Sequence, residues 1–147
     1  MKIEEFIRVY KGKNEKDREA LLKKHIVREY MPFEDKVAEA DKIIKSALYK
    51  DGKFEVHSAI VEELFALSVI ARYTDIEMDD LLTGYNLLEE NGINEFIEAI
   101  IHDVRKFRGI LDMMIADEKE KHSLVPFLSE QFEAFKLSFD EMKKGMN

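Results

Sequence analysis

The chain has 147 residues, a length that favours a single domain with a hydrophobic core of its own. Hydrophobic residues make up 46% of it and charged residues 37%, a balance that excludes both a disordered chain and a membrane protein. Cysteine is absent, which excludes disulfides, thiol nucleophiles and thiolate zinc sites.

The first thirty residues predict two helices. The first is a short amphipathic helix that ends near Gly12. Its apolar positions are Ile3, Phe6, Ile7 and Tyr10. Asn14 and Asp17 have the spacing of a capping box and predict a second helix that extends toward Tyr30.

A third helix begins at the Met31-Pro32 step. The residue before a proline is pushed out of helical geometry, whereas proline itself suits the first helical position. The apolar positions of this helix are Phe33, Val37, Ala40, Ile44, Ala47 and Leu48. After it, residues 51–58 contain the only hint of extended structure, and either a short strand near 53–57 or a loop fits there.

Residues 59–72 predict the core helix. Ser58 can cap it, and its apolar residues cover almost every face, which is typical of a helix in the centre of a bundle. We expect the next helix to bury one stripe and to stop at Asn91-Gly92. That stripe consists of Leu81, Leu82, Tyr85 and Leu88.

Two further helices complete the predicted fold. One begins at Ile93 and continues past Leu111, with a kink near Gly109 as an option, and the last begins at Ser123 or Pro126. The sequence therefore predicts an all-α, single-domain bundle of about six helices around the central apolar helix 59–72.

Negative charge is concentrated in one segment. Residues 73–104 carry nine acidic side chains and no Lys or Arg, so this segment is −9 while the rest of the chain is +1 and the total is −8. The asymmetry favours a cationic protein partner and disfavours nucleic acid or an anionic membrane. A solvated acidic face is the simpler interpretation. The candidate partner-binding residues are Asp75, Glu77, Asp79, Asp80, Glu89, Glu90, Glu95 and Glu98.

The same segment does not encode a calcium loop. An EF-hand loop that starts at Asp75 would place Asp80 where glycine is needed and Asn86 where a bidentate glutamate is needed. A helix start explains the carboxylates better. We expect Thr74 or Asp75 to end the preceding helix and to cap a new one, whose first turn contains Asp79 and Asp80.

Other catalytic and metal-binding patterns are missing. A di-iron bundle needs two Glu-x-x-His motifs, and no acid lies three residues before any of the four histidines. Glu98 with His102 and Glu118 with His122 have the i, i+4 spacing of exposed helix pairs. No nucleophile elbow or phosphate loop is present. We therefore predict no enzyme activity, no cofactor and no metal.

The last predicted helix is rich in aromatic residues and methionine. Leu128, Phe132, Phe135, Phe139 and Met142 have a heptad-like spacing, which favours a buried stripe. The alternative is a groove-binding surface made of Phe127, Phe132, Phe135 and Phe139, with Met142 and Met146 beyond them. The adjacent Met113 and Met114 cannot share one helix face, so at least one is expected to be exposed, a hint of self-association. Basic residues near the N-terminus alternate with acids, which cancels a nucleic-acid footprint.

Three stretches resemble a group of small helical proteins from phages and prophages of Gram-positive bacteria. They are LLKKHIVREYMPFEDKVAEADKIIKSALYK (21–50), RYTDIEMDDLLTGYNLLEENG (72–92) and ILDMMIADEKEKHSLVPFL (110–128). The resemblance implies a phage context, in the cytoplasm of the host cell or in the virion. It carries no active-site residue.

Two binding functions follow from this context. The first is virion assembly, as a tail assembly chaperone or a head or neck component that binds other phage proteins, with homo-oligomers as an option. The second is inhibition of a host nucleic-acid or defence protein by the acidic segment 75–98. An enzyme is the third and least supported class, because the required residue constellations are missing.

Overall fold

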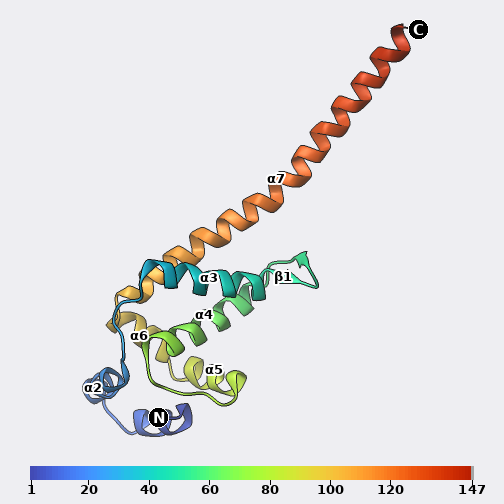
Figure 1. Ribbon diagram of the computed structural model, residues 1–147. Coiled ribbons are helices and arrows are strands. Elements are labelled where there is room, and N and C mark those ends of the chain that lie inside the picture. Colours follow the sequence, from blue (N-terminus) through green and yellow to red (C-terminus); the bar gives the residue numbers. More distant parts are fainter. Residues whose placement is uncertain (147) are drawn as a thin grey trace. The chain divides into compact units, whose positions relative to one another are not determined.

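The computed structural model describes residues 1–146, except for the side chains of residues 124–126 and 146. These residues form seven α-helices and one two-stranded hairpin (Figure 1): α1 (Ile3–Lys11), α2 (Glu15–His25), α3 (Phe33–Ala47), β1 (Tyr49–Lys50), β2 (Lys53–Phe54), α4 (Ser58–Tyr73), α5 (Leu81–Glu90), α6 (Ile93–Ile100) and α7 (Asp103–Met146). The predicted all-α class is confirmed. The chain divides into two compact units, Met1–Asp112 and Met113–Asn147.

The first two helices begin where the sequence predicts them. α1 buries its four predicted apolar positions and ends at Gly12. The Asn14 side chain caps α2 by accepting a hydrogen bond from the Asp17 amide at 2.9 Å. The predicted extent of α2 toward Tyr30 is wrong, because the helix ends at His25 and Ile26 is already extended.

Backbone pairing with a distant segment explains the early end of α2. The Val27 amide donates to the Tyr73 carbonyl, and the Asp75 amide donates to the His25 carbonyl, both at 2.9 Å. The same segment continues to Glu77, whose carbonyl accepts from the Ile3 amide at 2.9 Å. The backbone of residues 73–77 thus pairs with residues 25–27 and with residues 1–3. If α2 continued as a helix beyond His25, residues 25–27 could not form these hydrogen bonds.

The helices α3 and α4 pack side by side, and the hairpin joins them (Figure 1). Asp51 and Gly52 both have positive φ at its tip, as a two-residue Asp-Gly turn requires. α3 begins directly after Pro32, but the predicted packing of Phe33 is wrong, since that side chain is 62% exposed. Lys36 lies on the buried stripe instead, in line with Ala40, Ile43 and Ala47.

The core helix 59–72 is present as α4, and it buries one face, with Phe65 and Ile70 among its buried residues. Ile60 is exposed, so the predicted coverage on every side is wrong. Ser58 is the first helical residue and does not cap it; His57 precedes the helix without a side-chain cap. α4 contacts α3 on one side and α5 on another, which makes it central to the first unit.

The end of α5 lies where the sequence predicts it, but its cap and its buried side do not. Asp80 caps it by accepting from the Leu82 and Thr83 amides at 3.1 and 3.2 Å. The predicted burial of Leu81 and Leu82 is wrong, because both are exposed and the helix buries Gly84 and Leu88. The stop at Asn91-Gly92 is confirmed, with Gly92 in the left-handed region at φ 65°.

The last predicted boundaries are misplaced. The helix that begins at Ile93 is interrupted at Ile101 and His102, ahead of Asp103, rather than kinked near Gly109. No helix begins at Ser123 or Pro126, because the backbone of α7 is helical from Asp103 through Met146. α7 therefore contributes its first ten residues to the first unit and the rest to the second.

Candidate functional site

The eight candidate acidic residues fall into two groups, and the first group serves local structure. Asp75 lies 2.8 Å from Nδ1 of His25, and the Lys2 ammonium contacts Asp79 at 2.7 Å and Glu77 at 3.4 Å. Asp80 caps α5. Thr74 ends α4 as predicted and donates its hydroxyl to the Ile70 carbonyl at 2.7 Å. The predicted cap of the next helix at Thr74 or Asp75 is wrong, since Asp80 is that cap and Asp79 precedes it. These carboxylates hold the segment between α4 and α5 in place.

Three residues of the second group meet at a cavity in the first unit. Glu89 of α5 and Glu95 and Glu98 of α6 line a space of about 250 Å³ together with Glu62 of α4. Glu90 is exposed and does not line it. Four carboxylates therefore surround one cavity, although they come from three helices.

The cavity also has an aromatic wall and a cation of its own. Arg108 of α7 lies over the ring of Phe65, with its guanidinium carbon 4.4 Å from the ring centre, and it pairs with Glu62 at 2.5 Å. Tyr85 lines the cavity as well, and burial together with the nearby Glu89, Glu63 and Glu62 raises the pKa of its hydroxyl. The cavity is thus built to hold a guanidinium against an aromatic ring, and Arg108 already does so.

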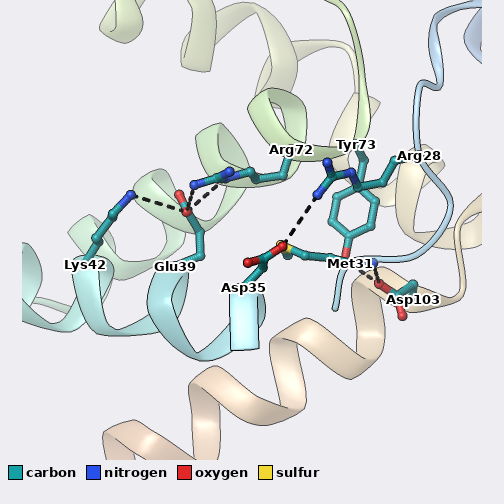
Figure 2. Close-up of polar contacts among 8 residues, drawn as sticks. All are labelled: Arg28, Met31, Asp35, Glu39, Lys42, Arg72, Tyr73 and Asp103. Carbon is teal, nitrogen blue, oxygen red and sulfur yellow. Dashed lines mark hydrogen bonds and ion pairs between the residues drawn. The ribbon is translucent and has the colours of Figure 1, made fainter. Parts of the chain in front are cut away.

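A second polar cluster lies in the core and was not predicted (Figure 2). The Asp103 carboxylate accepts hydrogen bonds from the Met31 amide at 2.8 Å and the Tyr73 hydroxyl at 2.7 Å. It also accepts from the Lys36 ammonium, which the figure does not draw, at 2.7 Å. The side chains of Lys36 and Asp103 are each only 5% exposed. The sequence signal for Lys36 was its place on the same helical stripe as Ala40 and Ile43, which follow it by four and seven residues.

The proton equilibria in this cluster follow from burial and pairing. Burial opposes ionisation of Asp103, but the hydrogen bonds from Lys36, Met31 and Tyr73 outweigh it and hold the pKa of its carboxyl below the usual value. Burial and the Asp103 carboxylate raise the pKa of the Tyr73 hydroxyl well above its usual range. Asp103 is therefore the ionised acceptor of the cluster, and Tyr73 is a neutral donor.

Ion pairs extend from this cluster along the α3–α4 interface (Figure 2). Arg72 donates to one oxygen of Glu39 at 2.6 and 3.0 Å, and Lys42 lies 3.8 Å from the same oxygen. Arg28 approaches Asp35 at 4.0 Å. These contacts fasten α3 to α4 and to the segment before α3, so their role is structural.

The second unit presents a different kind of surface. Its α7 residues Leu128, Phe132, Phe135, Phe139 and Met142 are all exposed, from 46% for Phe139 to 72% for Phe132. The predicted burial of this stripe is wrong, because the described residues of the second unit contain no second helix or strand. The expectation for Met113 and Met114 is confirmed, with Met113 exposed. Met146, the last residue of the alternative groove-binding surface, lies outside the described side chains.

Within the part of the chain that the structure describes, no three His, Asp or Glu side chains are grouped so that they could hold a metal ion. None of the helices in the described residues combines the length and the apolar composition needed to cross a bilayer. Comparisons of the chain with protein-family models, curated proteins and solved structures gave no match.

Proposed function

We propose that the chain is a non-enzymatic phage protein that acts by binding other proteins, as a virion assembly or structural accessory of the tail assembly chaperone or head and neck kind. The observation that carries this proposal is the exposed apolar face of α7, formed by Leu128, Phe132, Phe135, Phe139 and Met142. Contiguous apolar surface of this kind marks protein interaction sites, and helices present it to grooves at i, i+3, i+4 and i+7 spacing.

The phage context rests on the resemblance of residues 21–50, 72–92 and 110–128 to small phage and prophage proteins. The third of these stretches leads directly into the apolar face. Assembly proteins work by reversible contacts with other virion components, and an exposed apolar helix supplies such contacts without any reaction. This agreement between context and surface favours assembly over the other functions.

Site-specific photo-crosslinking in phage-producing cells tests the proposal. The crosslinking residue replaces Phe132 on the apolar face or, as a control, Leu137, which is 65% exposed and lies on the opposite side of the helix. We expect a virion structural protein to be attached to position 132 and not to position 137. Attachment to host proteins alone, or equal attachment at both positions, would contradict an assembly role.

The alternative is a small acidic inhibitor of a host nucleic-acid or defence protein, and one observation favours it. Glu89, Glu95 and Glu98 converge with Glu62 on a single cavity whose aromatic wall already holds a guanidinium. An arginine of a cationic partner would meet the same chemistry there, by replacing Arg108 or binding beside it.

Salt and charge reversal distinguish this alternative from assembly. Binding through carboxylates weakens steeply as salt rises, whereas an apolar contact does not. The triple variant Glu89→Lys, Glu95→Lys and Glu98→Lys should abolish inhibition of the host protein. Asp80 is left intact in this test because it caps α5, and its loss would unsettle the helix as well as the charge. Inhibition that survives the reversal excludes the acidic segment.

A further inference from the structure

The apolar face of α7 has the spacing of a coiled-coil seam. Its residues Leu128, Phe132, Phe135, Phe139 and Met142 follow one another by four and three residues in turn. In heptad terms Phe132 and Phe139 take position a, and Leu128, Phe135 and Met142 take position d. The seam spans about four helical turns, roughly 20 Å along the helix.

The second unit has no internal means of covering this seam. Its described residues belong to α7 alone. Helices in proteins draw most of their stability from packing an apolar face, and an apolar stripe must be buried against another element. The seam is the natural place for that burial, because the opposite side carries charged residues such as Glu130 and Lys144.

The flanks of the seam indicate which partner and which direction fit. One flank carries Lys136 and Lys143 at position e. The other carries the uncharged Gln131 and Ser138 at position g. In a parallel pair of identical helices, each e residue lies beside a g residue of the other helix, so both lysines meet neutral side chains. In an antiparallel pair the two lysine flanks would face each other and repel.

We propose that the α7 seam pairs with the seam of a second copy of this chain, as a parallel two-stranded coiled coil over residues 128–142. The inference rests on the apolar face invoked for the proposed function, and it names the partner that covers this face until a virion protein displaces the second copy. Lys143 lies with its ammonium 5.0 Å from the centre of the Phe139 ring, so its alkyl chain can cover the edge of the seam while its charge stays in water. Phe127 and Leu137 lie off the seam and remain exposed in the pair.

The molar mass of the full chain in solution tests the pairing. Sedimentation equilibrium over about a hundredfold range of concentration should show a dimer for the wild type. Phe135→Glu places a charge in the seam and should leave a monomer. Leu137→Glu is the matched control, since Leu137 is similarly exposed, at 65% against 69%, but lies off the seam; this variant should remain dimeric.

Three results would overturn the pairing. One is a wild type that stays monomeric throughout the range, and another is a dimer that persists in Phe135→Glu. The third is an assembly larger than two chains. Far-UV circular dichroism of each variant shows whether the first unit is folded. If Phe135→Glu is monomeric because it is misfolded, the milder variant Phe135→Ser takes its place in the test.

Cysteine crosslinking tests the direction, because the chain contains no native cysteine. Met142→Cys should form an intermolecular disulfide readily in a parallel pair, where the two position-142 residues face each other. In an antiparallel pair, position-a residues face position-d residues, so position 142 would instead face position 132. A disulfide that forms only between Met142→Cys and Phe132→Cys chains would overturn the parallel arrangement.

The pairing and the proposed function can fail separately. If position 132 crosslinks to a virion protein while the chain is monomeric, the pairing is wrong and the assembly role stands. If the chain is a parallel dimer but no virion protein is attached in phage-producing cells, the pairing stands and the assembly role is wrong.

Discussion

Asp103 ties together three parts of the first unit that are distant in the sequence. Its carboxylate accepts from Lys36 in α3, from Tyr73 at the end of α4 and from the Met31 amide in the segment between α2 and α3. A buried ion pair is costly to create, so it adds little stability over an apolar core, but it is very costly to break on one side only. The cluster therefore acts mainly by fixing how these segments meet.

Removing the buried cation tests this role. Lys36→Met leaves Asp103 buried with two neutral donors and should lower the free energy of unfolding by about 3–5 kcal/mol. Urea titration followed by circular dichroism measures the loss. Lys45→Met is the control, because Lys45 pairs with Asp41 at 2.7 Å on the exposed side of the same helix, and its loss should leave stability nearly unchanged. Equal effects in the two variants would contradict a role for the buried cluster.

Acid should weaken the same cluster. The pKa of the Asp103 carboxyl is lower in the folded protein than its ordinary value of 3.8, so the unfolded chain binds more protons in this range. The stabilisation is present above the ordinary pKa and is lost as pH falls through the lower, folded value. We expect wild type and Asp103→Asn to differ in unfolding free energy at neutral pH and to converge in acid. A constant difference across pH would exclude ionised Asp103 as the cause.

At the scale of the element, the start of α5 shows how a single side chain sets a helix boundary. Asp80 and its neighbour Asp79 are both exposed acids, but only Asp80 accepts from the first amides of the helix. Asp79 instead contacts Lys2. Comparing Asp80 with Asp79 therefore distinguishes the effect of a helix cap from the effect of a negative charge alone.

This difference is testable by substitution. Asp80→Ala should lower the free energy of unfolding by about 1 kcal/mol, since it leaves the α5 amides without their acceptor. Asp79→Ala should leave it nearly unchanged, because the pair with Lys2 is exposed. Chemical denaturation measures both. If Asp79→Ala proved the more harmful of the two, the cap would not be what holds this helix end.

Local signals in the sequence predicted several element boundaries. The Asn14 cap, the break at Pro32 and the stop at Gly92 depend on residues within a few positions, and each lies where it was expected. The end of α2 was missed because it depends on backbone pairing between Val27 and Tyr73, far apart in the sequence. Helical spacing also cannot tell a buried stripe from an exposed one, which is why Phe132 was misplaced.

The sequence predicted which segment holds the acidic residues of the candidate site, but not how they are arranged in space. The excess of carboxylates in residues 73–104 is plain in the sequence, but their division into a structural group and a cavity group requires the fold. The cavity also includes Glu62, Phe65 and Arg108, which lie outside the segment. No spacing rule connects residues on α4, α5, α6 and α7, because their proximity arises from tertiary packing.

At the scale of the whole molecule, the two compact units differ in the source of their stability. The first buries a core within itself, with Phe6, Leu22, Tyr73 and Phe107 almost wholly inaccessible. The described residues of the second are one helix with an exposed apolar seam. The first unit should therefore unfold independently of protein concentration, whereas the helix of the second should depend on pairing.

Thermal unfolding at several concentrations tests this difference. Circular dichroism at 222 nm should show two transitions, and only the one that belongs to the second unit should move to higher temperature as concentration rises. Phe135→Glu should lower that transition and leave the other in place. A single transition that is the same at all concentrations would contradict independent units.

The pairing of residues 1–3 with residue 77 bears on the order in which the first unit folds. The Glu77 amide donates to the Met1 carbonyl, the Ile3 amide donates to the Glu77 carbonyl, and α1 packs against α5. These segments are far apart in the sequence, so their contact closes a long loop of chain, and the entropy of that closure is lost before the contact forms. The contacts of α1 with α2, such as Arg18 over the Tyr10 ring, are local by comparison. We therefore expect α1 and α2 to meet early in refolding and the contact of α1 with residues 77–90 to form late.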